Sequence, residues 1–153
     1  MFAKSRARSN AKILGILLII ATGVIFTLVC PVRPVFAETP IEYFEFDSNT
    51  GTITNYDLAG GPEVVIPAKI SGVDVKTIGP GVFYEKELTS VFIPEGVIEI
   101  GKQSFQGNNL ISVEIPDSVK VIKDWAFTTN ELTLVEIPYS VEGMGGGAFG
   151  RNN

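Results

Sequence analysis

Three stretches of the chain contain residue types that could do chemistry, and one of them is rich in glycine. Residues 145–150 read Gly-Gly-Gly-Ala-Phe-Gly and contain the G-x-G-x-x-G spacing of dinucleotide-binding loops. Such a loop needs a buried strand before it, a helix after it and an acidic residue about 20 positions later. Only three residues follow Gly150, and the stretch occupies the same place in a sequence repeat as residues 101–107. We therefore expect a structural turn and no bound nucleotide.

The other two stretches carry acidic side chains. Asp47-Ser48-Asn49-Thr50-Gly51 is similar to the start of a calcium loop, but Leu58 stands where the bidentate glutamate should be, so a hairpin turn is the better interpretation. Glu114 and Glu136 would lie about 5 Å apart on neighbouring strands, which suits a retaining glycosidase. An acid and a nucleophile need different environments, whereas these two would share one exposed environment. We expect them to act as solubilising charge.

The composition excludes several classes of enzyme. The 153 residues include no histidine and one cysteine, so the chain has no Ser–His or Cys–His pair and no zinc site built from these residues. The formal net charge of −5 argues against a nucleic-acid partner. We expect a noncatalytic protein without a cofactor or a bound metal.

Residues 1–37 have the order of an export signal. Basic residues lie within positions 1–12, residues 13–29 are uncharged and apolar, and Val35-Phe36-Ala37 provides a cleavage site. We predict cleavage after Ala37 and a secreted or cell-envelope location. An uncleaved membrane anchor stays open, since the apolar stretch at ~1.5 Å per residue spans about 25 Å of the ~30 Å hydrocarbon core. Cys30 does not indicate lipidation, because Val29 stands where a small residue is needed.

A 22-residue repeat organises the rest of the chain. The apolar columns that recur at this spacing are Phe83, Phe105, Phe127 and Phe149; Ile93-Pro94, Ile115-Pro116 and Ile137-Pro138; Leu88, Leu110 and Leu132; Val91, Val113 and Val135; Val97, Val119 and Val141; and Ile78, Ile100, Ile122 and Met144. One such unit cannot bury its apolar face alone, so stacked units must share a continuous core.

Each unit predicts two short extended segments. In Val113-Glu114-Ile115, apolar and polar residues alternate with the period of a half-buried strand, which Pro116 ends. A second segment runs from Val119 to Ile122. We expect the closing turn to use the backbone freedom of Gly101 and Gly145, and Phe105 to cap the interior.

These units resemble the BspA-type leucine-rich repeats of bacterial exported surface proteins. The resemblance covers about residues 43–153, and its most specific phrases are Leu88-Thr89-Ser90-Val91-Phe92-Ile93-Pro94, Leu110-Ile111-Ser112-Val113-Glu114-Ile115-Pro116 and Trp125-Ala126-Phe127. It implies a mainly β, right-handed solenoid of short parallel strands. It also implies export, and binding to other proteins or to cells.

We predict an N-terminal cap with an atypical first repeat at residues 38–76, and leucine-rich repeats at residues 77–153. Alternating residues at 42–47 and 52–56 flank the turn Ser48–Gly51, which indicates a β-hairpin. Ile66-Pro67 precedes Ile93-Pro94 by more than one repeat length, so the extra residues should form an excursion at 69–75. The last repeat is incomplete, and its open edge is expected to favour self-association.

The outward strand face is the candidate partner-binding surface. It comprises Ser90, Phe92, Ser112, Glu114, Leu134 and Glu136. Phe92 stands where later units have glutamate, and either anchors a partner or packs beneath the excursion. Trp125 lies in a turn between strands, where a partly buried packing role is at least as well supported as contact with a partner. The expected function is noncatalytic recognition or adhesion, with a protein or glycan ligand at a cell surface; the alternative is a structural fragment of a longer array.

Overall fold

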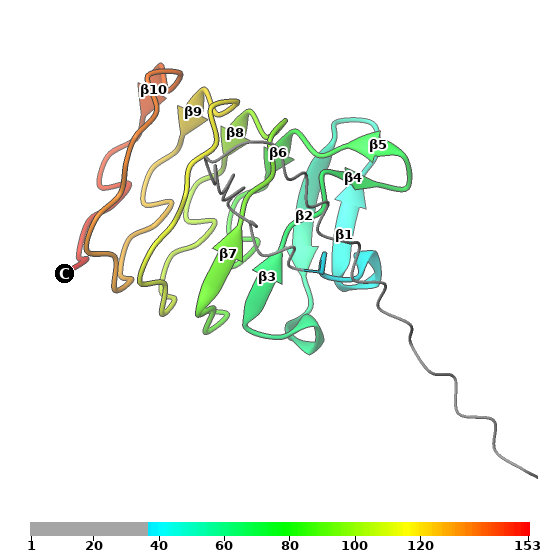
Figure 1. Cartoon of the computed structure of the whole chain (residues 1–153), viewed down its shortest axis with the longest axis horizontal. Coiled ribbons are helices and arrows are strands. Elements are labelled where there is room, and N and C mark those ends of the chain that lie inside the picture. Colours follow the sequence, from blue (N-terminus) through cyan, green and yellow to red (C-terminus); the bar gives the residue numbers. More distant parts are fainter. Residues whose placement is uncertain (1–36) are drawn as a thin grey trace, which may run out of the picture. The chain divides into compact units, whose positions relative to one another are not determined.

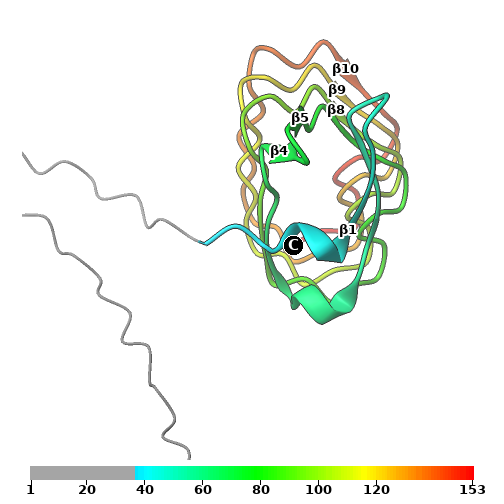
Figure 2. The same ribbon diagram turned by 90° about the vertical axis from the view of Figure 1, so that its right-hand side faces the viewer.

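In the computed structural model, which describes residues 37–153, the chain winds through successive coils that stack on one another (Figures 1 and 2). Figure 1 shows the coils following one another from the β1–β2 hairpin to the C-terminus, and the end-on view in Figure 2 shows their outlines superposed. Residues 1–36 of the predicted export signal, including Cys30, lie outside the described residues. Within residues 37–153, no helix is long and apolar enough to cross a membrane.

The elements are short, because each coil contributes only a few residues to a sheet. The two 3-10 helices are η1 (Ile41–Tyr43) and η2 (Leu58–Gly60). The strands are β1 (Phe44–Asp47), β2 (Thr52–Tyr56), β3 (Glu63–Val65), β4 (Lys69–Ile70), β5 (Val73–Asp74), β6 (Thr77–Ile78), β7 (Ser90–Phe92), β8 (Glu99–Ile100), β9 (Val121–Ile122) and β10 (Gly143–Met144).

The main sheet has six strands in the order β1-β2-β6-β8-β9-β10, and it is parallel from β2 onward. Ile78 pairs with Ile100, Ile100 with Ile122 and Ile122 with Met144, so each partner lies one repeat length further along the chain. The three isoleucines are fully buried, because this slot faces the interior in their coils, whereas Met144 in the last coil is exposed. The strand predicted at residues 119–122 is present as β9, with shorter bounds.

The strands predicted around Val113–Ile115 and in the equivalent segment of the next coil are wrong. Of the equivalent segments, only β3 and β7 pair, in parallel, and no backbone hydrogen bond joins residues 111–116 to β7 in the described chain. The alternation still sets burial, since Val113 and Ile115 are buried while Glu114 is exposed. An alternating pattern therefore predicted which side chains face the interior, but it did not predict a hydrogen-bonded ladder.

The N-terminal elements agree with the predicted hairpin and excursion. β1 and β2 pair antiparallel across the turn at residues 48–51, with a bulge between Glu45 and Phe46. The predicted start of the first strand is wrong, because residues 41–43 form η1. The excursion is a second small hairpin, in which β4 pairs antiparallel with β5.

An aromatic ladder runs through the core. Phe83, Phe105 and Phe127 are fully buried, and successive rings from Phe83 to Phe149 stack with centroids 4.9–5.2 Å apart. Tyr56 extends the ladder into the hairpin, 5.1 Å from Phe83. Phe105 thus occupies the interior position that the repeat predicts.

A second ladder consists of asparagines, which the repeat pattern contains at the same spacing but which our sequence analysis missed. The Nδ2 group of Asn130 donates to the carbonyl oxygens of Phe105 and Phe127, and its Oδ1 accepts from the Leu110 amide. Asn108 and Asn152 make the equivalent bonds in their own coils. Each asparagine therefore joins two coils through groups that would otherwise lack partners.

Gly101 and Gly145 were predicted to provide backbone freedom in the closing turn, and this prediction is wrong. Neither residue has a positive φ. A Cβ atom at Gly101 would lie only 2.6 Å from the carbonyl oxygen of Ile78, so this glycine permits close contact between coils.

Candidate functional site

The predicted partner-binding surface contains a hollow of about 410 Å³. Four of the six predicted residues line it, namely Ser90, Phe92, Ser112 and Glu114. Ala37, Glu63 and Val65 also line the hollow. So do Val64, Val91 and Val113, whose side chains belong to the core or pack against it. We call this feature the strand-face hollow. One side of the hollow is formed by the hydrogen-bonded strands β3 and β7. The other side is the segment around Ser112–Glu114, which makes no backbone hydrogen bond to β7.

Phe92 is the most exposed large apolar side chain of this hollow, at 45% of its full accessible area. Its backbone is fixed, because Val65 is its partner in the β3–β7 ladder and its carbonyl oxygen accepts from the Ile66 amide at 3.1 Å. The excursion at residues 69–75 does not line the hollow and leaves Phe92 half exposed. The half-exposed ring of Phe92 favours the interpretation in which this residue anchors a partner over packing beneath the excursion.

Leu134 and Glu136 are exposed but lie outside the strand-face hollow. Leu134 lines a separate hollow of about 290 Å³ in the last coil, with Val135, Ile137 and Phe149 among its neighbours. The predicted surface thus divides into two regions.

Glu63 and Val65 were absent from the predicted surface. They belong to the atypical first repeat, whose length differs from the others. Its Ile66-Pro67 pair gives the correct alignment, since Glu63 then falls opposite Ser90 and Val65 opposite Phe92, as the structure has them.

The chemistry of the strand-face hollow is that of a binding surface. Serine hydroxyls donate and accept hydrogen bonds, carboxylates accept them, and the aromatic ring of Phe92 provides apolar area. Within the described part of the chain, no group of three histidine, cysteine, aspartate or glutamate side chains could hold a metal ion. The lining of the hollow therefore combines hydrogen-bonding groups with an exposed apolar ring.

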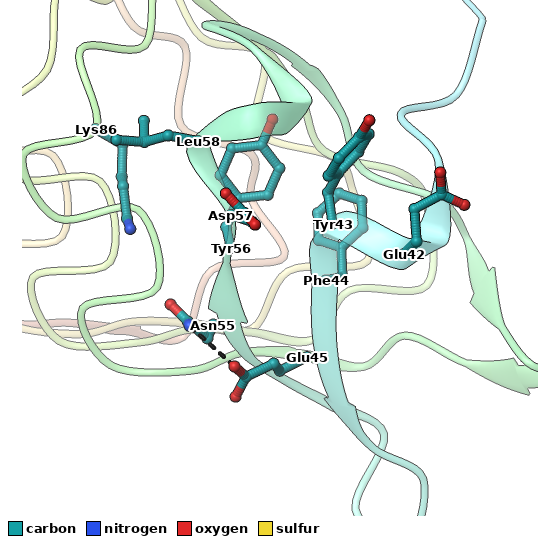
Figure 3. Close-up of a pocket in the computed structure, with 9 residues that line it drawn as sticks. All are labelled: Glu42, Tyr43, Phe44, Glu45, Asn55, Tyr56, Asp57, Leu58 and Lys86. Carbon is teal, nitrogen blue, oxygen red and sulfur yellow. Dashed lines mark hydrogen bonds between the residues drawn. The ribbon is translucent and has the colours of Figure 1, made fainter.

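A polar hollow of about 340 Å³ lies beside the N-terminal hairpin (Figure 3). Glu45 accepts a hydrogen bond of 3.1 Å from Asn55, and the carboxylates of Glu42, Glu45 and Asp57 point to different places instead of facing one another. Burial raises the pKa of Tyr56, with a smaller contribution from the charge of Asp57, and the phenol donates to the Gly61 carbonyl oxygen at 2.9 Å. This hollow is held together by structural contacts and has no pair of convergent acids.

A family model described as the BspA type leucine-rich repeat region matches residues 62–153 in six copies. The chain belongs to this family. The BspA-type repeats fill the described coils from Pro62 onward, including every residue of the strand-face hollow except Ala37. No curated protein matches the sequence.

Solved structures of leucine-rich repeat proteins have similar folds. The BspA-type chain is 28% identical to a leucine-rich repeat protein of T. pallidum, with a TM-score of 0.60, and covers 74% of its own length and 67% of that chain. A protein of Bacteroides capillosus is 29% identical, with a TM-score of 0.57 and coverages of 72% and 86%. A protein of Bacteroides ovatus is 26% identical, with a TM-score of 0.59 over 77% of this chain, which spans only 33% of that protein.

Proposed function

We propose that this BspA-type repeat protein is an exported, noncatalytic recognition module that binds a partner protein through the strand-face hollow. The observation that carries the proposal is the half-exposed ring of Phe92 on β7, which lines the hollow together with Ser90, Ser112 and Glu114. In the full proposal, the β1–β2 hairpin caps a right-handed solenoid with a 22-residue period. Export rests on the sequence of residues 1–37 and on the family.

Phe92 has the properties of an anchor residue. Residues that dominate binding energy are often aromatic and lie within a ring of polar contacts that excludes water. Ser90 and Ser112 provide hydroxyl groups next to Phe92, and Val65 adds apolar area from the neighbouring strand. A partner side chain that fills the hollow would bury this ring while the serines satisfy polar groups at its edge.

The charges of the hollow favour a basic partner surface. Glu63 and Glu114 line it, and no lysine or arginine is among its lining residues. Residues 38–153 carry 17 acidic and 7 basic residues, so the wider surface has the same sign. Complementary charge accelerates association and excludes partners with acidic surfaces.

The test compares capture of proteins from cell-envelope and host extracellular extracts by the wild type and two variants. Phe92→Ser removes the anchor, and Ile98→Ser is its matched control, since Ile98 has a similar exposure of 44% but lies outside the hollow. We expect Phe92→Ser to lose a partner that the wild type and Ile98→Ser both retain. Equal retention by all three proteins would refute the proposed site.

The last coil supports a second, structural role as a surface for another copy of the chain. Its slots that face the interior in earlier coils are open: Ile137 is 39% exposed, against 5% for the equivalent Ile115. Met144 on β10 is also exposed, and β10 is the edge of the six-stranded sheet. Exposed apolar side chains next to a free strand edge favour pairing with a similar edge.

A further inference from the structure

A fourth hollow, of about 500 Å³, surrounds Trp125 in the turns of three successive coils. Each coil contributes equivalent positions: Gln103 and Gln106 from one, Trp125 and Thr128 from the next, and Gly147 and Gly150 from the third, with Arg151 beside them. We call it the Trp125 hollow. It shares no residue with the strand-face hollow.

The hollow exists because glycines replace side chains next to Trp125. A Cβ atom at Gly147 would lie 2.9 Å from Trp125 Cδ1, which is closer than such atoms approach in proteins. The indole therefore lies directly against the glycine. Gly150 likewise presents no side chain, and the space above both glycines remains open to a ligand.

Trp125 occupies a backbone position that is unfavourable for a bulky residue. Its φ is +55°, and the equivalent positions in other coils are Gly81 at +65°, Gln103 at +57° and Gly147 at +64°. Two of these four residues are glycines, which adopt this conformation without steric cost. A positive φ is thus a property of this slot in every one of these coils, and tryptophan is the bulkiest residue that adopts it.

Hydrogen bonds hold the backbone of the turn that carries Trp125, and the indole ring itself contacts Lys102. The Trp125 amide donates to the Gly146 carbonyl oxygen at 3.1 Å, and the Gly146 amide donates to Asp124 Oδ1 at 2.7 Å. The Lys102 ammonium lies 5.0 Å from the ring centroid, in cation–π geometry. Even so, 45% of the side chain is exposed. A fixed, exposed aromatic surface can bind a ligand with little loss of conformational entropy.

The polar groups of the hollow match hydroxyl groups. Gln103 Nε2 donates to Gln106 Oε1 at 2.9 Å, which leaves Gln103 Oε1 as an acceptor and the Gln106 NH₂ group as a donor. The indole N–H has no hydrogen-bond partner among the described residues and adds another donor. A sugar ring offers C–H groups to an aromatic face and hydroxyls that both donate and accept.

The charge around the Trp125 hollow differs from the rest of the described chain. Arg151 is among its lining residues and Lys102 lies over the indole, whereas no aspartate or glutamate lines it. Arginine binds carboxylates through two parallel hydrogen bonds. We infer that the Trp125 hollow is a glycan-binding site that prefers pyranose sugars bearing a carboxylate.

The single tryptophan of the chain makes this site directly observable, because tryptophan fluorescence reports on Trp125 alone. The purified chain is titrated with oligogalacturonate and sialyllactose as carboxylated probes, and with lactose as the neutral counterpart of sialyllactose. We expect a saturable fluorescence change with a carboxylated probe, and a response to lactose that is weaker by about tenfold or more in affinity. No saturable response to either carboxylated probe would overturn the inference.

Variants separate a binding role from a structural role, with saturation-transfer NMR as the readout because it does not need tryptophan. Trp125→Gly should lose about tenfold or more in affinity while melting at or above the wild-type temperature, since glycine relieves the strained φ. Arg151→Gln should lose the preference for carboxylated probes. A Trp125→Gly variant that binds like the wild type would refute the site. So would a Trp125→Gly variant that melts at a lower temperature, if replacing Trp125 with another aromatic residue does not restore sugar binding. Ile98→Ser, at an exposed residue that lines neither hollow, should leave sugar binding unchanged. The Trp125 hollow shares no residue with the strand-face hollow, so failure of sugar binding is distinguishable from failure of the proposed protein-binding function.

Discussion

The side-chain amide of Asn108 donates a hydrogen bond of 2.7 Å to the carbonyl oxygen of Phe83, which lies in the preceding coil. The same side chain accepts from the backbone amides of Lys86 and Leu88 and donates to the Phe105 carbonyl oxygen. One asparagine thus satisfies buried backbone groups of two coils at the turn where neither coil has a strand partner. Backbone hydrogen bonds between coils lie on both sides of Asn108, from the Gly107 amide to the Thr128 carbonyl oxygen and from the Asn109 amide to the Leu88 carbonyl oxygen. The asparagine therefore adds side-chain bonds to a backbone network at this turn.

We predict that Asn108→Ala lowers the free energy of unfolding by about 2–4 kcal/mol, because each buried backbone group left without a partner costs about 1–3 kcal/mol. Asn109→Ala is the matched control: the adjacent residue is exposed, and its replacement should change stability by less than about 0.5 kcal/mol. Denaturant unfolding followed by circular dichroism gives both values. Equal effects of the two substitutions would contradict the proposed role of the ladder.

Much of this fold could be predicted from the spacing of apolar residues. The repeating columns of isoleucine and phenylalanine lie in register in the sheet and in the aromatic ladder, because identical slots in stacked coils have identical neighbours. The hydrogen bonding of residues 111–116 could not be predicted in this way, because alternation determines the direction of side chains and not the distance between backbones. Asn108, Asn130 and Asn152 recur at the same spacing as the phenylalanines, so this column could also have been predicted from the sequence. A search for repeats among apolar residues alone does not find it.

The candidate sites were less predictable than the core. Phe92 was recognisable because it stands where the next two coils have glutamate, but its degree of exposure could be read only from the folded chain. The Trp125 hollow depends on the lack of side chains at Gly147 and Gly150, which line it. Such a gap appears only when three coils are placed side by side.

The aromatic ladder predicts a gradient of stability effects along the repeats. Phe105 is fully buried between Phe83 and Phe127, so Phe105→Ala should cost about 3–5 kcal/mol and lower the melting temperature substantially. Phe149 is only partly buried and stacks on one ring, so Phe149→Ala should cost clearly less. Thermal unfolding of both variants tests this order. An unchanged melting temperature for Phe105→Ala would invalidate the register of the repeats.

Two aspartates near the N-terminal end should make stability depend on acid pH. Hydrogen bonds from the Asn49 amide and the Thr50 hydroxyl lower the pKa of Asp47, and the Lys69 ammonium, 2.6 Å away, lowers the pKa of Asp74. Folding therefore favours the charged carboxylates, and the unfolded chain binds more protons in this range. Their contribution is complete above the ordinary aspartate pKa of 3.8 and is lost as the pH falls through the lowered values.

Asp47→Asn and Asp74→Asn should each reduce the loss of stability on acidification, because asparagine keeps a hydrogen-bond acceptor but does not titrate. Urea unfolding at a series of pH values, from neutral to below the aspartate range, measures the effect. Added salt should weaken the Asp74 contribution, since both partners of this ion pair are exposed. Parallel pH profiles for the wild type and both variants would show that these carboxylates make no such contribution.

The open last coil predicts association between copies of the chain. Met144 continues the buried column of Ile78, Ile100 and Ile122 but is exposed on the edge strand β10, so a second copy that covers it would bury apolar area and pair the free strand edge. Analytical ultracentrifugation should show a concentration-dependent dimer that Met144→Lys weakens by about tenfold or more, since a charge at the centre of such a contact must be desolvated. Tyr139→Ser is the control in the same coil, because Tyr139 is fully exposed and belongs to no interior column. A monomer at all concentrations, or a dimer that Met144→Lys leaves intact, would show that this edge does not mediate association.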